Sequence, residues 1–226
     1  YMATREEKDS TRGRANVLRL AISGQLGSDD WAKRELHDVL DLCLECKACK
    51  SECPTGVDMA RLKAEFLHQF YRKQGIPLRT RLLADVSTAA LWGSRFAPLS
   101  NWLLQSTLIR WMNKKIVGLD DRRILPKFSR QTFFDWWHRH RIAAKESLND
   151  EPPVRDGPRI AIFVDTFINY FEPQHAIATA KIAERFGHRI MVPQYVCCGR
   201  PLISKGLLDK ARRQAEATTR ALWPLA

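Results

Sequence analysis

The residues of this sequence best suited to chemistry are four cysteines that fall within eleven positions and are followed directly by a proline. They are Cys43, Cys46, Cys49 and Cys53, and the proline is Pro54. Thiolates hold iron–sulfur clusters, and the spacing C-x2-C-x2-C-x3-C-P is a bacterial ferredoxin pattern. The segment Cys43–Cys53, called the cysteine run below, therefore predicts a [4Fe–4S] site.

A structural zinc ion is the alternative, because four cysteines can also coordinate zinc tetrahedrally. Zinc sites typically combine two separated C-x2–4-C pairs, whereas this chain has one continuous run. The spacing therefore favours iron–sulfur over zinc.

The fourth cysteine of such a run binds the other cluster when a protein holds two. We therefore expect Cys43, Cys46 and Cys49 to share one cluster with a cysteine outside the run. Cys53 would bind a second cluster, whose remaining ligands belong to a second run that this chain lacks.

Basic residues accompany the run. Lys47 and Lys50 stand between the cysteines, where positive charge would raise the reduction potential of a cluster. Plain solvated surface is the alternative for both lysines. Arg12 and Arg14 either steer an anionic partner or lie on an ordinary helix surface.

The elements around the run are predicted to be helical. Thr4 and Glu7 have capping-box spacing, which predicts a helix over residues 4–24. Apolar residues at helical spacing, starting from Trp31, predict a second helix up to the first cysteine, and a third runs from after Pro54 to residue 74. The run should therefore lie in a loop between helices.

The rest of the chain changes character twice. Residues 76–146 read as helices rich in tryptophan, and residues 147–158 have the proline and acid content of a linker. Beyond it we predict a strand from Arg159, a helix over 174–186, a strand over 189–192 and a helix over 207–222. This order indicates a parallel α/β unit over residues 159–226.

Charge and cysteine content restrict the class of protein. The net charge is +12, yet residues 1–70 carry 11 basic and 12 acidic groups, so the excess lies further along the chain. There the basic residues are scattered among Trp and Leu, which favours solvated helix faces over a nucleic-acid site. Thr4 to Arg14 lacks the apolar stretch of a secretory signal, and six cysteines without such a signal indicate a reducing compartment, so we expect the cytoplasm.

Four segments carry a resemblance to a known family: residues 1–7, residues 10–16, the cysteine run, and Cys197-Cys198-Gly199-Arg200-Pro201. Together they resemble the C-terminal half of bacterial FAD-linked oxidoreductases of the D-2-hydroxyglutarate dehydrogenase type. More distantly, they are similar to the iron–sulfur subunits of glycolate oxidase and anaerobic glycerol-3-phosphate dehydrogenase. The resemblance covers nearly the whole chain.

The resemblance implies an α+β protein of several parts. Residues 1–75 would form an α-helical ferredoxin-like domain that is incomplete at its N-terminus, followed by the helical region 76–146, the linker 147–158 and a partial cysteine-rich "CCG" domain over 159–226. In the family, a Cys-Pro-x triplet ending another cysteine run stands directly before the stretch matching Tyr1. That run would supply the missing ligands, giving two [4Fe–4S] clusters in the full-length protein, and an FAD-binding part precedes it.

Cys197 and Cys198 resemble the centre of the CCG domain. Many relatives carry an additional cysteine after a glycine near the end of the first strand, where this chain has Asp165-Thr166. The pair therefore either binds metal or has a structural role at a packed surface. We expect Asp165 to cap a helix.

The function implied is electron relay, from a reduced flavin in the absent part of the same polypeptide, through the clusters, to an external acceptor. A flavin takes two electrons and a cluster carries one, so the clusters would split the pair. This chain holds no complete active site of its own. One alternative is a free-standing subunit that docks to a separate flavoprotein at the membrane through the Trp-rich helices of 92–137. The other is a zinc-stabilised basic module that binds nucleic acid.

Overall fold

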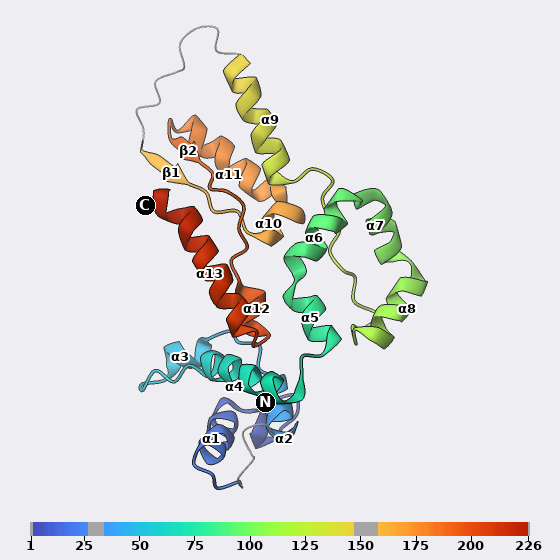
Figure 1. Cartoon of the computed structure of the whole chain (residues 1–226), viewed down its shortest axis with the longest axis vertical. Helices are drawn as coiled ribbons and strands as arrows, with labels where there is room; N and C mark the ends of the chain where they lie inside the picture. Colours follow the sequence, from blue (N-terminus) through green and yellow to red (C-terminus); the bar gives the residue numbers. More distant parts are fainter. Residues whose placement is uncertain (1, 27–33, 147–157, 226) are drawn as a thin grey trace. The chain divides into compact units, whose positions relative to one another are not determined.

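The structure is a computed structural model that describes residues 2–26, 34–146 and 158–225 (Figure 1). It is mostly helical, with one parallel pair of strands. Contacts divide the chain into two compact units. Unit 1 comprises Tyr1–Ala84 and Gly199–Arg212, and unit 2 comprises Asp85–Cys198 and Arg213–Ala226.

Unit 1 is an assembly of helices around one apolar core. Its elements are η1 (Glu7–Asp9), α1 (Thr11–Ile22), α2 (Arg34–Asp41), α3 (Ala48–Glu52), α4 (Met59–Gln74), α5 (Leu78–Ala84) and α12 (Arg200–Ser204). The core is built on Phe66 of α4, Leu40 of α2 and Leu18 of α1, which are all buried. In Figure 1, α1 and α2 lie together beside α4, and α12 packs on α4 and α5.

The first helix begins later than its capping box predicted. Ser10 is the N-cap of α1 and accepts a hydrogen bond from the amide of Gly13 at 2.9 Å. Glu7 instead belongs to the short 3-10 turn η1, so the predicted start at Thr4 is wrong. The reason is steric as well as polar, because the Gly13 backbone approaches the carbonyl of Glu7 so closely that a Cβ would collide with it. Trp31, the predicted start of the second helix, lies outside the described residues.

Unit 2 joins helices to the two-stranded sheet. Its elements are α6 (Val86–Arg95), α7 (Ala97–Gln105), α8 (Thr107–Ile116), α9 (Phe133–Glu146), β1 (Arg159–Ala161), α10 (Thr166–Tyr170), α11 (Pro173–Arg185), β2 (Arg189–Met191) and η3 (Trp223–Leu225). Helix α13 (Leu208–Leu222) contributes residues to both units.

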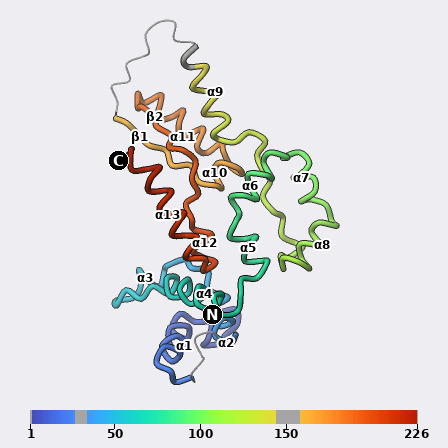
Figure 2. Tube along the Cα trace, in the orientation of Figure 1, coloured from blue at the N-terminus to red at the C-terminus, as the bar shows by residue number. Residues whose placement is uncertain are grey.

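The parallel strand pair confirms the predicted change from helices to a parallel α/β arrangement. Ile160 of β1 is paired with Ile190 of β2. Helices α9 and α11 pack against each other, as Figure 2 shows, around buried Phe133 and Ala180. Helix α10 was not predicted. Residues 147–157 of the predicted linker lie outside the described part of the chain, and the domain limits 1–75, 76–146 and 159–226 stay predictions.

Candidate iron–sulfur site

The prediction that the cysteine run lies in a loop between helices is confirmed only for its first part, because residues 48–52 form the short helix α3. Cys43 follows α2, Cys49 lies in α3 and Cys53 directly follows α3. Glu45 and Lys47, on either side of Cys46, have φ values of 55° and 62°, the left-handed conformation that residues with a side chain rarely adopt. Cys46 therefore stands between two residues in the left-handed conformation.

The four thiols differ in exposure, and none is in a disulfide. Cys46 is exposed, whereas Cys43, Cys49 and Cys53 are partly buried. Cys46 also lines an open surface hollow with Lys47, Ala48, Lys50 and Ser51. The side of the loop around Cys46 is therefore open to solvent.

Cys53 has surroundings that favour its thiolate. The hydroxyl oxygen of Thr55 lies 3.1 Å from the Cys53 sulfur. Hydrogen bonds from this hydroxyl and from the backbone amides of Val57, Thr55 and Gly56 lower the pKa of the Cys53 thiol. Because the thiolate is the form that binds metal, these donors prepare Cys53 to act as a ligand.

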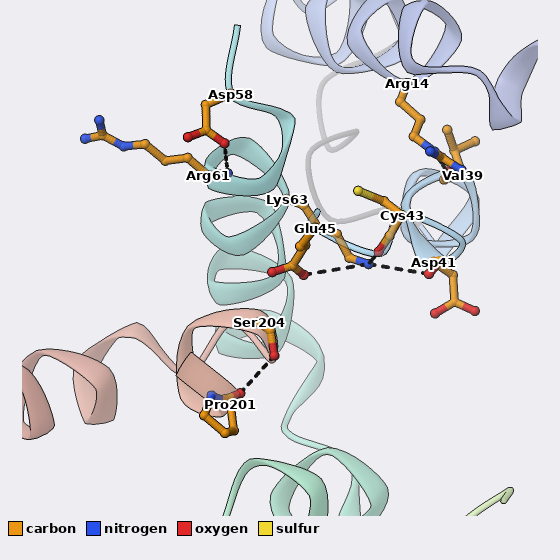
Figure 3. A network of polar contacts seen from close by, with 10 residues as sticks. All are labelled: Arg14, Val39, Asp41, Cys43, Glu45, Asp58, Arg61, Lys63, Pro201 and Ser204. Atoms are coloured by element: carbon orange, nitrogen blue, oxygen red, sulfur yellow. Dashed lines mark hydrogen bonds and ion pairs between the residues drawn. The ribbon is translucent and has the colours of Figure 1, made fainter. Parts of the chain in front are cut away.

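A buried lysine binds the backbone at the start of the cysteine run. Lys63 of α4 donates to the carbonyl of Cys43 at 2.7 Å and to that of Asp41 at 3.4 Å, and its Nζ lies 3.8 Å from Oε1 of Glu45 (Figure 3). Burial lowers the pKa of Lys63 and raises that of Glu45. The sequence interpretation missed this residue. Its signal is a lysine on the inward-facing stripe of α4, four residues after buried Met59 and four before buried Leu67.

Lys47 and Lys50 share one carboxylate. Their ammonium groups lie 3.6 Å and 3.9 Å from Asp58, which also caps α4 by accepting the Arg61 amide at 3.0 Å. That amide, followed by the two lysines, lowers the pKa of Asp58. The positive charge predicted between the cysteines is thus partly balanced by an anion that the sequence interpretation did not include.

Arg12 and Arg14 both have partners within unit 1. Nε of Arg12 lies 2.8 Å from the carboxylate of Glu7. Nε of Arg14 donates to the carbonyl of Val39 at 3.2 Å, which ties α1 to α2. Arg14 therefore has a structural contact, and Arg12 lies in an exposed ion pair.

The donor set fits an iron–sulfur cluster. Within residues 2–26, 34–146 and 158–225, no three His, Cys, Asp or Glu side chains converge on a single ion. A [4Fe–4S] cluster binds each thiolate at a different iron atom, so its ligands need not converge in this way. Four unpaired thiols within eleven residues of chain are the donors that such a cluster requires.

The second cysteine pair has different surroundings. Cys197 and Cys198 are partly buried in unit 2, and the carbonyl of Cys197 accepts from Nε2 of Gln214 at 2.9 Å and from the Thr218 hydroxyl at 3.1 Å. Asp165 accepts the amide of Ile168 at 2.9 Å, which confirms its predicted role as a helix cap.

Tyr195, two residues before Cys197, bonds to the distant Thr166. The hydroxyl oxygen of buried Thr166 lies 2.9 Å from that of Tyr195. Burial raises the pKa of Tyr195 to about 12. Thr166 and Tyr195 therefore form a neutral hydroxyl pair.

Comparison with known proteins supplies the decisive observation. Residues 1–58 match the family described as "4Fe-4S dicluster domain". The chain is 25% identical to a D-2-hydroxyglutarate dehydrogenase of Pseudomonas putida, over 95% of this chain and 24% of that protein. These similarities fit an iron–sulfur region of this type. The predicted resemblance is confirmed, and iron–sulfur is supported over zinc.

Two relatives from Escherichia coli are named as subunits of larger enzymes. The chain is 32% identical to a subunit of anaerobic glycerol-3-phosphate dehydrogenase, over 60% of this chain and 31% of that protein. It is 24% identical to the glycolate oxidase iron-sulfur subunit, over 99% of this chain and 49% of that protein. Together with the dicluster domain, these matches support an electron-transfer role.

The chain spans about a quarter or less of the length of the first D-2-hydroxyglutarate dehydrogenases that it matches. No solved structure shows significant similarity to it. Within the described ranges, every helix is too short or too polar to traverse a bilayer.

Proposed function

We propose that Cys43, Cys46 and Cys49 bind one [4Fe–4S] cluster and that Cys53 contributes to a second, within an α-helical ferredoxin-like domain over residues 1–75. A bound cluster accepts and releases one electron at a time. The observation that carries the proposal is the cysteine run itself, which lies within the match to a dicluster domain.

The residues of this chain have separate tasks in the proposal. Thr55 and the amides after Pro54 stabilise the thiolate of Cys53. Exposed Cys46 and the hollow beside it mark the side at which an electron donor or acceptor can approach. Lys47 and Lys50 provide positive charge on this side, and Asp58 limits it.

At the level of the whole protein, we propose the oxidation of a 2-hydroxy acid by FAD, with electrons leaving through the clusters to an external acceptor in the cytoplasm. The relatives named D-2-hydroxyglutarate dehydrogenase support this substrate class. FAD would be bound by a flavin domain of the same polypeptide, and nucleic acid is not a partner.

The test is anaerobic purification of the full-length protein, followed by iron and acid-labile sulfide analysis and electron paramagnetic resonance. Addition of a D-2-hydroxy acid should bleach the flavin and then produce cluster signals. Zinc in a colourless protein, or iron without inorganic sulfide, would overturn the proposal for the cysteine run. If dithionite reduces the clusters but no hydroxy acid does, only the proposed substrate class is overturned.

A second candidate is a separate iron–sulfur subunit that docks to a flavoprotein, with peripheral contact to a membrane. The relatives named as subunits favour it, and so does a series of exposed apolar side chains along α6, α7 and α8. These are Trp92, Phe96, Leu99, Trp102, Leu108 and Trp111. The docking face would end there, because Trp137 is buried and Trp136 packs against the core of unit 2, which corrects the predicted face over 92–137.

Trp102→Ser tests this second candidate, since Trp102 is 67% exposed. If docking uses this face, the purified variant should lose its flavoprotein partner while keeping its iron content. Retention of the partner would contradict the docking face, and a flavin found in the same polypeptide would contradict the separate subunit.

We also propose that residues 159–226 form a partial CCG-type domain that contains the thiol pair Cys197 and Cys198. The resemblance of Cys197-Cys198-Gly199 supports a metal site, whereas the contacts of the Cys197 carbonyl fit a structural role equally well. The iron content of a Cys197→Ser variant distinguishes the two roles.

A further inference from the structure

Lys63 is a charged residue in an apolar place. It lies in the middle of α4 with its side chain 10% exposed, and its neighbours on the helix, Ala64, Phe66 and Leu67, belong to the buried interior of unit 1. Removing an ammonium group from water is costly unless good acceptors replace the lost solvent. A neutral apolar side chain would serve the core at lower cost. The acceptors around Lys63 must therefore explain why a lysine stands here.

All three acceptors come from one short stretch of chain. Nζ of Lys63 meets the carbonyls of Asp41 and Cys43 and the carboxylate of Glu45, at 3.4, 2.7 and 3.8 Å. An ammonium group has three N–H donors, of which two go to these carbonyls, and the Glu45 carboxylate adds an ion pair. Figure 3 shows the three contacts converging on the lysine from the end of α2 and the loop after it.

This stretch leads directly to the proposed ligands. Cys43 supplies one of the carbonyls, and Glu45 precedes Cys46 in the left-handed conformation. The contacts of Lys63 with residues 41, 43 and 45 hold the backbone in place on both sides of Cys43. Removing a group that orients a metal ligand typically weakens metal binding by about 10–100-fold, even though the group does not touch the metal.

We infer that Lys63 is a positioning residue for the cluster bound by Cys43, Cys46 and Cys49. The inference rests on the proposed function and deepens it. Lys63 holds the loop in its ligating shape before metal arrives, and its positive charge beside Cys43 favours the reduced cluster. Glu45 keeps this charge in place and offsets part of it.

The experiment uses Lys63→Met in the full-length protein, with Lys73→Met as the matched control. Lys73 is an exposed lysine on the same helix, so the chemical change is identical and only the location differs. We expect Lys63→Met to lose its cluster to a chelator about tenfold faster than wild type. Its reduction potential should fall and its paramagnetic resonance signal should broaden, with both unchanged in Lys73→Met. Wild-type values for Lys63→Met would overturn the inference.

Two further variants separate charge from folding. Lys63→Arg keeps the charge and the donors and should restore much of the cluster stability. Glu45→Gln removes the opposing charge and should raise the potential while iron content is retained. If Lys63→Met proves insoluble, an unchanged potential in Glu45→Gln would overturn the inference instead.

Hydrogen exchange on the metal-free protein separates this inference from the proposed function. In Lys63→Met, the amides of residues 41–47 should exchange faster than in wild type and in Lys73→Met. This difference does not need a cluster, so it can be seen even if wild-type protein contains no iron. Equal exchange in all three proteins would overturn the positioning role, whereas absent iron in wild type would overturn only the proposed function.

Discussion

The two cysteine-bearing segments of this chain differ in what surrounds them. In the cysteine run, polar groups act on both the backbone and the sulfur atoms, since Lys63 binds the carbonyl of Cys43 and the Thr55 hydroxyl lies 3.1 Å from the sulfur of Cys53. At the second pair, Gln214 and Thr218 of α13 bind the backbone carbonyl of Cys197. The polar contacts of the cysteine run thus reach a sulfur atom, whereas these contacts of the second pair go to a backbone carbonyl.

The difference shows two ways in which thiols become organised. A run with short gaps keeps its cysteines close together through chain connectivity, and in the proposed site Lys63 helps to orient them. Two adjacent cysteines cannot surround a cluster, and they need ligands from distant parts of the chain. Thr166, at the start of α10, is engaged with Tyr195.

The largest expected effect tests this comparison directly. In the full-length protein, Cys43→Ser should remove about half of the iron, because one of the two proposed clusters loses a ligand. Cys197→Ser should leave the iron content unchanged. Iron analysis and paramagnetic resonance of anaerobic samples measure both. Equal losses in the two variants would place Cys197 among the ligands and remove the distinction between the segments.

A smaller effect concerns the packing behind the cysteine run. Gly206 has φ +67°, and a Cβ there would lie 2.9 Å from the backbone nitrogen of His68 and would collide with Leu67 of α4. Gly206→Ala should therefore lower the free energy of unfolding of unit 1 by about 2–4 kcal/mol, from steric overlap added to left-handed strain.

Gly187→Ala is the matched control, because Gly187 has φ +78° with nothing within 4 Å of the added atom. Gly187→Ala should lower the free energy of unfolding only by the cost of the left-handed conformation, about 1–2 kcal/mol. Thermal unfolding of both variants gives the difference. A loss in Gly206→Ala no larger than in Gly187→Ala would contradict the close approach of Gly206 to α4.

Much of this architecture was accessible from sequence, for a physical reason. The spacing of the cysteines, the helices around them and the change to a parallel strand pair all depend on local patterns, which contacts in the folded chain reinforced. The start of α1 was missed because Ser10 and the close packing of Gly13 outweighed the capping box of Thr4 and Glu7. A capping box is a preference of a few neighbouring residues. The packing of α1 against η1 depends instead on the folded structure.

The supporting groups of the site could not be predicted in the same way. Lys63 lies 20 residues from Cys43 in sequence, and only the folded helix brings its ammonium group under the loop. Asp58 likewise faces Lys47 and Lys50 only after the loop has turned. The candidate ligands can be predicted from the spacing of the cysteines. The groups that contact them can be identified only from the tertiary structure.

The junction at Cys197 predicts a modest effect on stability. Thr218→Val removes one of the two hydrogen bonds to the Cys197 carbonyl and should cost about 1 kcal/mol. Thr219→Val is the control, because the Thr219 hydroxyl bonds only within the helix, to the carbonyl of Ala215. Iron content should be unchanged in both variants, and loss of iron in Thr218→Val would link the pair to a metal site.

The smallest expected effect is on the reduction potential and involves Lys47 and Lys50. Replacing both with glutamine should lower the potential, because positive charge near a cluster favours its reduced form. The shift should be smaller than that of Lys63→Met, since both lysines are exposed to solvent and Asp58 already balances part of their charge. Asp58→Asn, with both lysines intact, should shift the potential in the opposite direction. Potentiometric titration in low salt measures all three proteins, and an unchanged potential in the double variant would leave these lysines as ordinary solvated surface.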